Sequence, residues 1–245
     1  MDAPKAVHLT GGNRFDQIRL DIPASFAVQD EWLSHVDKID VRRAALVGAR
    51  RAVWHRVSRR ARLREVLVTT GLERMWFDEF EDYWLHVLDG RPISINDFHQ
   101  LRFVYRTRAQ HSQQLDWSTP EQHLANWQAP ENISATFAFV HRAAIEPMRD
   151  RALLNRLSSK MRVLEYGCSI APLYRMWRHF ASHRDVEWVL ADIPNYPFHY
   201  ARHVYGRDRS ASFCTVVPGA SDSVPAERFD LIAVQEVFEH LDRPL

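Results

Sequence analysis

Acidic and small residues follow the apolar runs in the last third of this 245-residue chain. Glu165 lies near the end of the run Arg162–Tyr166, Gly167 follows it, and Asp192 ends the run Val186–Asp192. A glycine after a strand lets the backbone turn tightly and lets a ligand approach closely. Asp192 comes 25 residues after Gly167, close to the offset of about 20 residues of an acid that binds ribose hydroxyls. These residues predict a nucleotide-type site, although Asp192 taken alone is better explained as a helix N-cap.

The pattern that must position these residues is an alternation of strands and helices after about residue 160. The strand-like runs are Arg162–Tyr166, Val186–Asp192, Ser212–Val217 and Phe229–Val234, and the helix-like segments are Pro172–Ser182, Tyr196–Tyr205 and one that begins at Glu236. This order predicts an α/β fold, a Rossmann-like doubly wound parallel sheet with right-handed crossovers. Ligands bind such sheets beyond the carboxyl ends of the strands. We also expect free N–H groups at the helix start near Pro172 to face an anionic part of the ligand.

Two motifs in this region carry a family resemblance. VLEYGC at Val163–Cys168 and FDLIAVQEVFEHL at Phe229–Leu241, with the acid Asp192 between them, resemble the class I S-adenosylmethionine-dependent methyltransferases. The resemblance covers about residues 161–245. Dinucleotide oxidoreductases share the strand–glycine–helix turn, but they usually show a fuller G-x-G-x-x-G and lack the EHL segment. The resemblance therefore implies S-adenosyl-L-methionine as the cofactor.

The first motif implies roles on the methionine side of that cofactor. Gly167, Cys168 and Ser169 match the loop that wraps the methionine part, and Glu165 matches the acid that organises this loop and the amino end of the cofactor. Ser169 and Ala171 stand where the family has glycines. These departures leave open whether the loop has room for the carboxylate of the cofactor.

The later motifs imply roles on the nucleoside side. Asp192 matches the ribose-binding acid, and Ile193 matches the apolar residue beside adenine. Ser221 lies near the position where many relatives have an acid for the adenine amino group, and Gln235 falls near the sulfonium. His240 has an ordinary pKa suited to taking a proton from an acceptor, although in the family this histidine is more often structural. We expect no metal site.

The resemblance implies transfer of a methyl group to an O, N or C atom of a small-molecule acceptor. Two alternatives stay open. One is a methyltransferase-like binding or scaffold protein without catalysis, and the other is a nucleic-acid methyltransferase that uses the segment Arg42–Arg64. This segment holds nine arginines and no acid. A solvated helix face explains it more simply, because charged helix faces are common.

The chain before the cofactor domain has mostly helical patterns. We predict a mainly helical region over residues 1–155, acting as a lid, acceptor or dimerisation element, and a cofactor domain over 156–245 that is truncated after its fourth strand. Its apolar edge, Leu231–Val234, would then be uncovered unless a partner chain or an N-terminal element such as Ile18–Ile22 covers it. Five aromatic residues are expected in the core rather than in a pocket: Trp76, Trp84, Trp117, Trp127 and Phe137.

Composition excludes several classes of protein. The hydrophobic fraction of 46% is enough for a core, and the net charge of +1 gives no global attraction to nucleic acid. Cys168 and Cys214 form neither a metal-ligand spacing nor a disulfide framework. The chain shows no signal-peptide pattern and no apolar run of membrane-spanning length. We therefore expect a cytoplasmic protein with a small-molecule partner, possible homo-oligomers, and no membrane contact.

Overall fold

The computed structural model describes residues 72–88, 93, 98–99, 101–102, 105–106, 119–128, 132–145, 150–217, 224, 227–235 and 237. Several features predicted from the sequence lie outside these residues, namely Ile18–Ile22, Arg42–Arg64, Trp117, Ser221 and His240. Within the described residues, no helix is long and apolar enough to cross a membrane.

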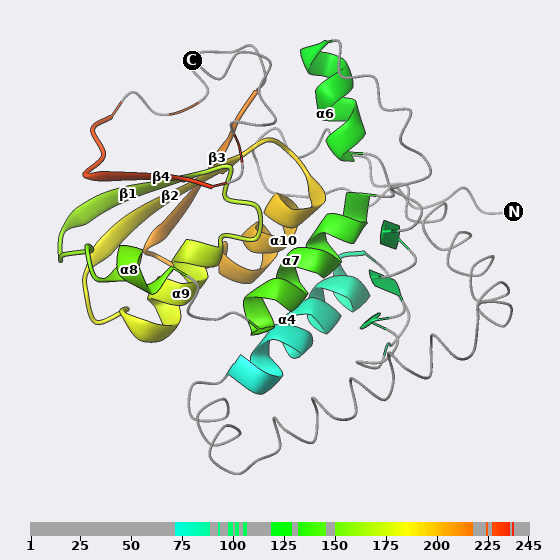
Figure 1. Ribbon diagram of the computed structural model, residues 1–245, viewed down its shortest axis with the longest axis horizontal. Coiled ribbons are helices and arrows are strands. Elements are labelled where there is room, and N and C mark those ends of the chain that lie inside the picture. Colours follow the sequence, from blue (N-terminus) through cyan, green and yellow to red (C-terminus); the bar gives the residue numbers. More distant parts are fainter. Residues whose placement is uncertain are drawn as a thin grey trace, which may run out of the picture.

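A parallel sheet of four strands is the centre of the C-terminal part (Figure 1). Its strands are β1 (Met161–Tyr166), β2 (Val186–Asp192), β3 (Ala211–Thr215) and β4 (Leu231–Val234), in the spatial order β3-β2-β1-β4. β1 pairs with β2 on one side and with β4 on the other, so that Glu165 lies opposite Leu190 and Ala233. This arrangement is α/β and Rossmann-like, which confirms the predicted fold class.

Two helices connect the first three strands and cover one face of the sheet. α9 (Pro172–Phe180) joins β1 to β2, and α10 (Tyr196–Tyr205) joins β2 to β3. Since both connections run in the same direction across the sheet, right-handed crossovers place both helices on the same face, as Figure 1 shows. Leu190 and the other strand residues that face them are buried in the main core.

The opposite face of the sheet has a smaller apolar cluster. Its buried members are Leu164, Val189, Ala191 and Val216, and no residue of a described helix belongs to it. Beside this face, Ile232 of β4 is 56% exposed. Among the described strands, β4 is one of the two outermost strands of the sheet.

The helical region before the sheet shares its core with the α/β part. Its helices are α4 (Leu72–His86), α6 (Pro120–Gln128), α7 (Ile133–Ile145) and α8 (Arg151–Leu154). Phe80 of α4 lies 4.7 Å from Phe137 of α7, and Tyr83 lies 5.3 Å from Tyr200 of α10, measured between ring centroids. One continuous cluster of buried residues contains these rings together with residues of β1 and β2. Trp76, Trp84 and Phe137 are buried there, as predicted, whereas Trp127 is half-buried.

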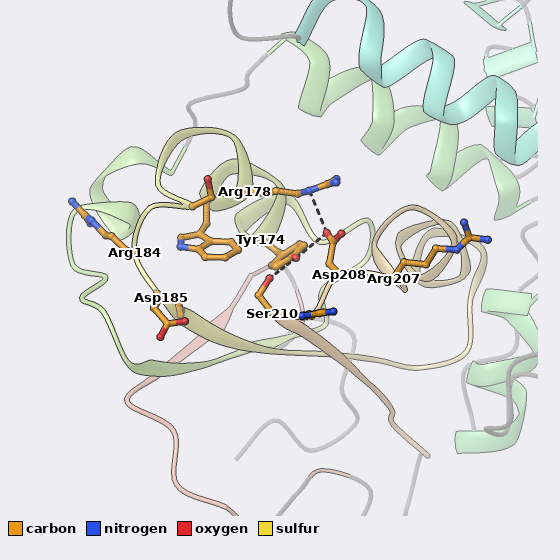
Figure 2. A pocket seen from close by; sticks show the side chains of 11 residues that line it. Tyr174, Arg178, Arg184, Asp185, Arg207, Asp208 and Ser210 are labelled. Atoms are coloured by element: carbon orange, nitrogen blue, oxygen red, sulfur yellow. Dashed lines mark hydrogen bonds and ion pairs between the residues drawn. The ribbon is translucent and has the colours of Figure 1, made fainter.

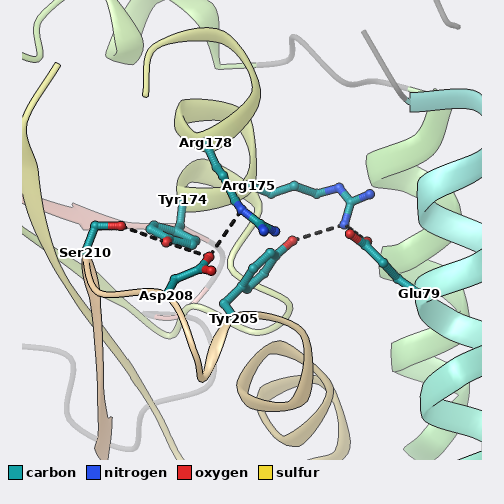
Figure 3. Close-up of polar contacts among 7 residues, drawn as sticks. All are labelled: Glu79, Tyr174, Arg175, Arg178, Tyr205, Asp208 and Ser210. Carbon is teal, nitrogen blue, oxygen red and sulfur yellow. Dashed lines mark hydrogen bonds and ion pairs between the residues drawn. The ribbon is translucent and has the colours of Figure 1, made fainter. Parts of the chain in front are cut away.

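A buried ion pair joins the helical region to the sheet (Figure 3). Arg175 of α9 is 5% exposed, and its Nη1 donates to Glu79 of α4 at 2.6 Å and to the Tyr205 hydroxyl at 3.0 Å. Taking two charges out of water costs several kcal/mol, and the attraction between them offsets that cost only while both partners remain. This pair therefore adds a polar contact between α4 and α9 to the aromatic core that the helices share.

We predict that Glu79→Gln lowers the free energy of unfolding by about 3 kcal/mol, because it leaves the Arg175 guanidinium buried without a counter-charge. Asp78→Asn, an exposed change on the same helix, should alter the free energy of unfolding by less than about 0.5 kcal/mol. Urea denaturation measures both variants. The double variant Glu79→Leu with Arg175→Met should recover part of the loss; fully additive effects of the two single changes would contradict the pairing.

Candidate functional site

The carboxyl edge of the sheet contains the point where the strand order reverses. The chain leaves β1 towards β2, while β4 lies on the other side of β1. In open α/β sheets this switch point is where ligands bind. The segment between β1 and α9, Gly167–Ala171, lies there and is called the β1–α9 loop below.

The β1–α9 loop has the backbone of a glycine-rich loop although it has a single glycine. The φ angles are +66° at Gly167, +53° at Ser169 and +55° at Ala171. Left-handed backbone costs a non-glycine residue about 1–2 kcal/mol, and such strain persists where surrounding contacts impose it. Ser169 and Ala171 therefore adopt a backbone conformation that glycine takes most easily.

Hydrogen bonds attach this loop to the end of β2. Cys168 N donates to Ala191 O at 3.1 Å, and Ser169 N donates to the Asp192 carboxylate at 2.6 Å. Within the loop, Ala171 N donates to Cys168 O at 2.6 Å. These bonds supply the constraint that holds two non-glycine residues in the left-handed region.

Glu165 occupies the start of α9. Its side chain is buried, and its two carboxylate oxygens accept from Leu173 N and Tyr174 N, each at 3.0 Å. The sequence led us to expect free N–H groups near Pro172 that face a ligand. That expectation was wrong for these two donors, because β1 ends close enough to α9 for the protein's own Glu165 carboxyl group to accept from them. The same contact fixes the end of β1 against the start of α9, and the role of Glu165 at the amino end of the cofactor stays a prediction.

Asp192 holds the β1–α9 loop and the start of the next connection together. One carboxylate oxygen accepts from Ser169 N, and the other accepts from Ile193 N at 2.7 Å and from Asn195 Nδ2 at 3.1 Å. Only 8% of the residue is exposed. Binding of ribose by Asp192 stays a prediction, and the structure adds that both of its oxygens already have partners within the chain.

Asn195, which the sequence analysis did not single out, is the N-cap of α10. Its side-chain oxygen accepts from Phe198 N at 2.9 Å, and its amide group donates to Asp192. The signal was present in the sequence, since an asparagine followed closely by a proline at Pro197 is typical of a helix start. The cap places Asn195, not Asp192, at the start of this helix.

Burial changes the acidity of both carboxyl groups. Burial raises the pKa of Asp192 to about 7, against the lowering effect of the N–H donors that it accepts from. Burial likewise raises the pKa of Glu165 to about 8, with lowering by the Leu173 and Tyr174 N–H groups and smaller raising effects from Asp150 and Asp192. Both groups therefore titrate near neutral pH.

The other predicted site residues differ in how much of each is exposed to solvent. Cys168 is 2% exposed and lies in the main core, where burial raises the pKa of its thiol, so its backbone rather than its sulfur faces the edge. Ser169, Ile193 and Gln235 are half-buried. The Ser169 hydroxyl has no hydrogen-bond partner within the described residues. Among those residues there is also no group of His, Cys, Asp and Glu that could hold a metal ion.

Gly167 is in direct contact with the segment that follows β4. A methyl group added at Gly167 would overlap the side chain of Val237. The first residue of the loop is therefore restricted twice, by its positive φ and by this contact. Val237 belongs to the EVFEHL motif, so the two motifs of the family resemblance meet at this point.

The helical region also reaches the carboxyl edge. The start of α6 follows a sequence pattern typical of helix starts, a threonine directly before a proline, and Gln122 N donates to the Thr119 hydroxyl at 3.2 Å. At its other end, Gln128 Nε2 donates to Pro194 O at 3.0 Å, in the connection that follows Asp192. Figure 1 shows α6 apart from the α4 and α7 pair, beyond the sheet edge. The sequence indicated the helix but gave no sign of this contact, because it joins residues far apart in the chain.

Comparison with known proteins gives few matches. No protein-family model and no curated protein matches the chain. Among solved structures, MtNAS, a nicotianamine synthase crystallised in complex with MTA and tNA, is 16% identical with a TM-score of 0.30, over 92% of this chain and 73% of that chain. A single-residue mutant of MtNAS is also 16% identical with a TM-score of 0.31, over 94% and 78% of the two chains. These values are too low to identify a family, so the function is inferred from the residues of this chain alone.

The positive φ of Gly167 and its contact with Val237 predict that substitution at Gly167 destabilises the fold more than substitution at Ser169. Gly167→Ala should lower the free energy of unfolding by more than about 2 kcal/mol, because it adds both backbone strain and the overlap with Val237. Ser169→Gly should change that free energy by less than about 1 kcal/mol, since relief of strain offsets the greater freedom of the unfolded chain. Thermal or urea unfolding of both variants is the measurement. Adding Val237→Ala to Gly167→Ala should restore the part caused by overlap, and no restoration would refute the contact.

The raised carboxyl pKa values predict that stability falls as pH rises above about 6.5. In this range the folded chain keeps protons on Asp192 and Glu165 that the unfolded chain has released, so the loss between pH 6.5 and 8 is on the order of 2 kcal/mol. Below this range, burial lowers the pKa of His179 to about 4 and of His199 to about 3, and these two groups oppose the trend.

Urea unfolding between pH 6.5 and 8 tests this profile. Asp192→Asn should show a shallower fall than the unchanged chain, because one of the two titrating groups is gone and the amide keeps an acceptor oxygen. Stability that stays level or increases over this interval in the unchanged chain would contradict the prediction.

Proposed function

We propose that this chain binds S-adenosyl-L-methionine at the carboxyl edge of β1 and transfers its methyl group to an O, N or C atom of a small-molecule acceptor. The observation that carries the proposal is the β1–α9 loop, whose left-handed residues lie at the switch point of the sheet and next to Val237 of the second motif. The sequence resemblance of Val163–Cys168 and Phe229–Leu241 to class I methyltransferases selects this cofactor over a dinucleotide.

In this proposal the chain's own residues hold the cofactor in place. Backbone groups of Gly167 and Ser169 line the methionine side, Asp192 and Ile193 line the nucleoside side, and Gln235 at the end of β4 lies near the reacting centre. Glu165 acts indirectly, because both its oxygens hold α9. The sulfonium of the cofactor supplies an activated methyl group. The protein's main contribution is to hold the acceptor atom in line with it, and positioning can supply most of the acceleration.

The contact of α6 with the connection after β2 supports a role for the helical region at the acceptor side. Gln128 ties α6 to Pro194, two residues beyond Asp192. Figure 1 shows the helix beyond the strand ends, where an acceptor would approach. We propose that α6 forms one wall of the acceptor site.

A second candidate is a cofactor-binding protein without catalysis. The departures of Ser169 and Ala171 from the glycines of the resembled family favour it. The internal partners of Asp192 bear on both candidates, because a ribose would have to share that carboxylate with Ser169, Ile193 and Asn195. Formation of S-adenosylhomocysteine from S-adenosylmethionine with a panel of small hydroxyl and amino acceptors would exclude this candidate.

Calorimetry with S-adenosylhomocysteine tests the proposed site. Ile193→Ala should weaken binding about fivefold, because loss of apolar contact with adenine costs about 1 kcal/mol. Ile232→Ala removes the same atoms from the exposed edge of β4 and should leave the affinity unchanged. Absence of binding by the unchanged chain, or equal effects of the two variants, would refute the assignment. NAD serves as the competing ligand for the dinucleotide alternative.

A further inference from the structure

A cavity of about 420 Å³ lies at the amino edge of the sheet (Figure 2). Val186, the first residue of β2, and Ser210, just before β3, line it together with Tyr174, Trp177 and Arg178 of α9. Because all four strands are parallel, this cavity and the β1–α9 loop are at opposite ends of the strands. It is therefore separate from the proposed cofactor site.

The floor of the cavity is formed by two hydroxyl groups, and the neighbouring carboxylate of Asp208 has an arginine as its counter-charge. The Tyr174 hydroxyl donates to Asp208 at 3.0 Å and lies 3.0 Å from the Ser210 hydroxyl. Arg178 Nε pairs with the same Asp208 oxygen at 3.2 Å, and its guanidinium lies over the Tyr205 ring (Figure 3). The charge of Asp208 is thus offset within the protein, and Arg178 is fixed in place.

The rim carries positive charge that the described residues do not balance. Arg184 Nη1 donates to two backbone carbonyls, Leu154 O at 2.6 Å and Leu157 O at 2.8 Å, which orient its guanidinium without neutralising it. Arg207 and Arg209 are exposed, and neither forms an ion pair within the described part of the chain. Against these three arginines the rim has one exposed acid, Asp185.

Figure 2 shows how these groups are arranged. Arg184 and Arg207 lie on opposite sides of the Tyr174 and Ser210 floor, and their guanidinium groups extend outward from it. An anion in the cavity would therefore draw Arg207 and Arg209 inward. Ordering long side chains costs conformational entropy, so the affinity is modest unless the ligand carries several charges.

We propose that this cavity binds a small ligand that carries a chain of phosphate groups, with the phosphates spanning Arg184, Arg207 and Arg209. Guanidinium groups bind phosphate through paired hydrogen bonds, which favours phosphate over a single carboxylate. The cavity volume is in the range of small-molecule pockets. Its lining comes from two short segments, Tyr174–Val186 and Arg207–Ser210, which favours a small ligand over a nucleic-acid strand.

Calorimetry with inorganic tripolyphosphate and with ATP tests the proposal on the full chain. Tripolyphosphate should bind with a Kd on the order of 0.1–1 mM at low salt. The double variant Arg207→Gln/Arg209→Gln should weaken this binding at least about tenfold, because two of the three proposed arginine contacts with phosphate are lost. The control Arg106→Gln/Arg228→Gln removes the same charge from two exposed arginines outside the cavity and should leave Kd within about twofold.

A variant that should bind more tightly controls for loss of binding caused by destabilisation of the fold. Asp185→Asn removes the exposed acid of the rim and should tighten tripolyphosphate binding about threefold, which a merely destabilised chain would not do. Three results would overturn the proposal. The first is equal weakening of tripolyphosphate binding in the two double variants, and the second is loss of ATP binding when the chain is saturated with S-adenosylhomocysteine. The third such result is an oligonucleotide that binds far more tightly than tripolyphosphate. The last would make this face a nucleic-acid surface instead.

Discussion

The contact between the Glu165 carboxylate and the first N–H groups of α9 is the interaction on which the rest of the described structure depends. It sets where α9 begins relative to the end of β1, and the five residues between them must then turn within a very short distance. That constraint, with the bond from Ser169 N to Asp192, produces the left-handed residues of the β1–α9 loop. A carboxylate with two donors fixes one geometry, whereas an apolar contact at the same place would allow several.

α9 then transmits this geometry to three other parts of the molecule. Arg175 joins it to α4 of the helical region, and Tyr174 and Arg178 line the cavity at the amino edge of the sheet. Its start belongs to the proposed cofactor site. The helical region and the sheet accordingly share one core, and any movement of α9 along its axis would affect the carboxyl edge and the amino edge together.

The sequence predicted those features that depend on neighbouring residues. Val186–Asp192 and Tyr196–Tyr205 were located to the residue, because a run of strand-forming residues and a capped helix start are local signals. Three contacts were not predicted, since each joins residues that are distant along the chain: Ser169 with Asp192, Glu79 with Arg175, and Gln128 with Pro194. The resemblance suggested a role for Glu165 beside the cofactor, which stays a prediction, and it gave no sign that this side chain occupies the start of α9.

The positive φ angles at Ser169 and Ala171 have a consequence for how the sequence of this loop can vary. What these positions require is a backbone conformation, and glycine is only the residue that adopts it most easily. Asparagine and aspartate can also adopt it, whereas valine, isoleucine and threonine are sterically excluded. The loop can therefore diverge through a narrow set of small or polar residues without losing its shape, and a search for the glycines themselves would overlook it.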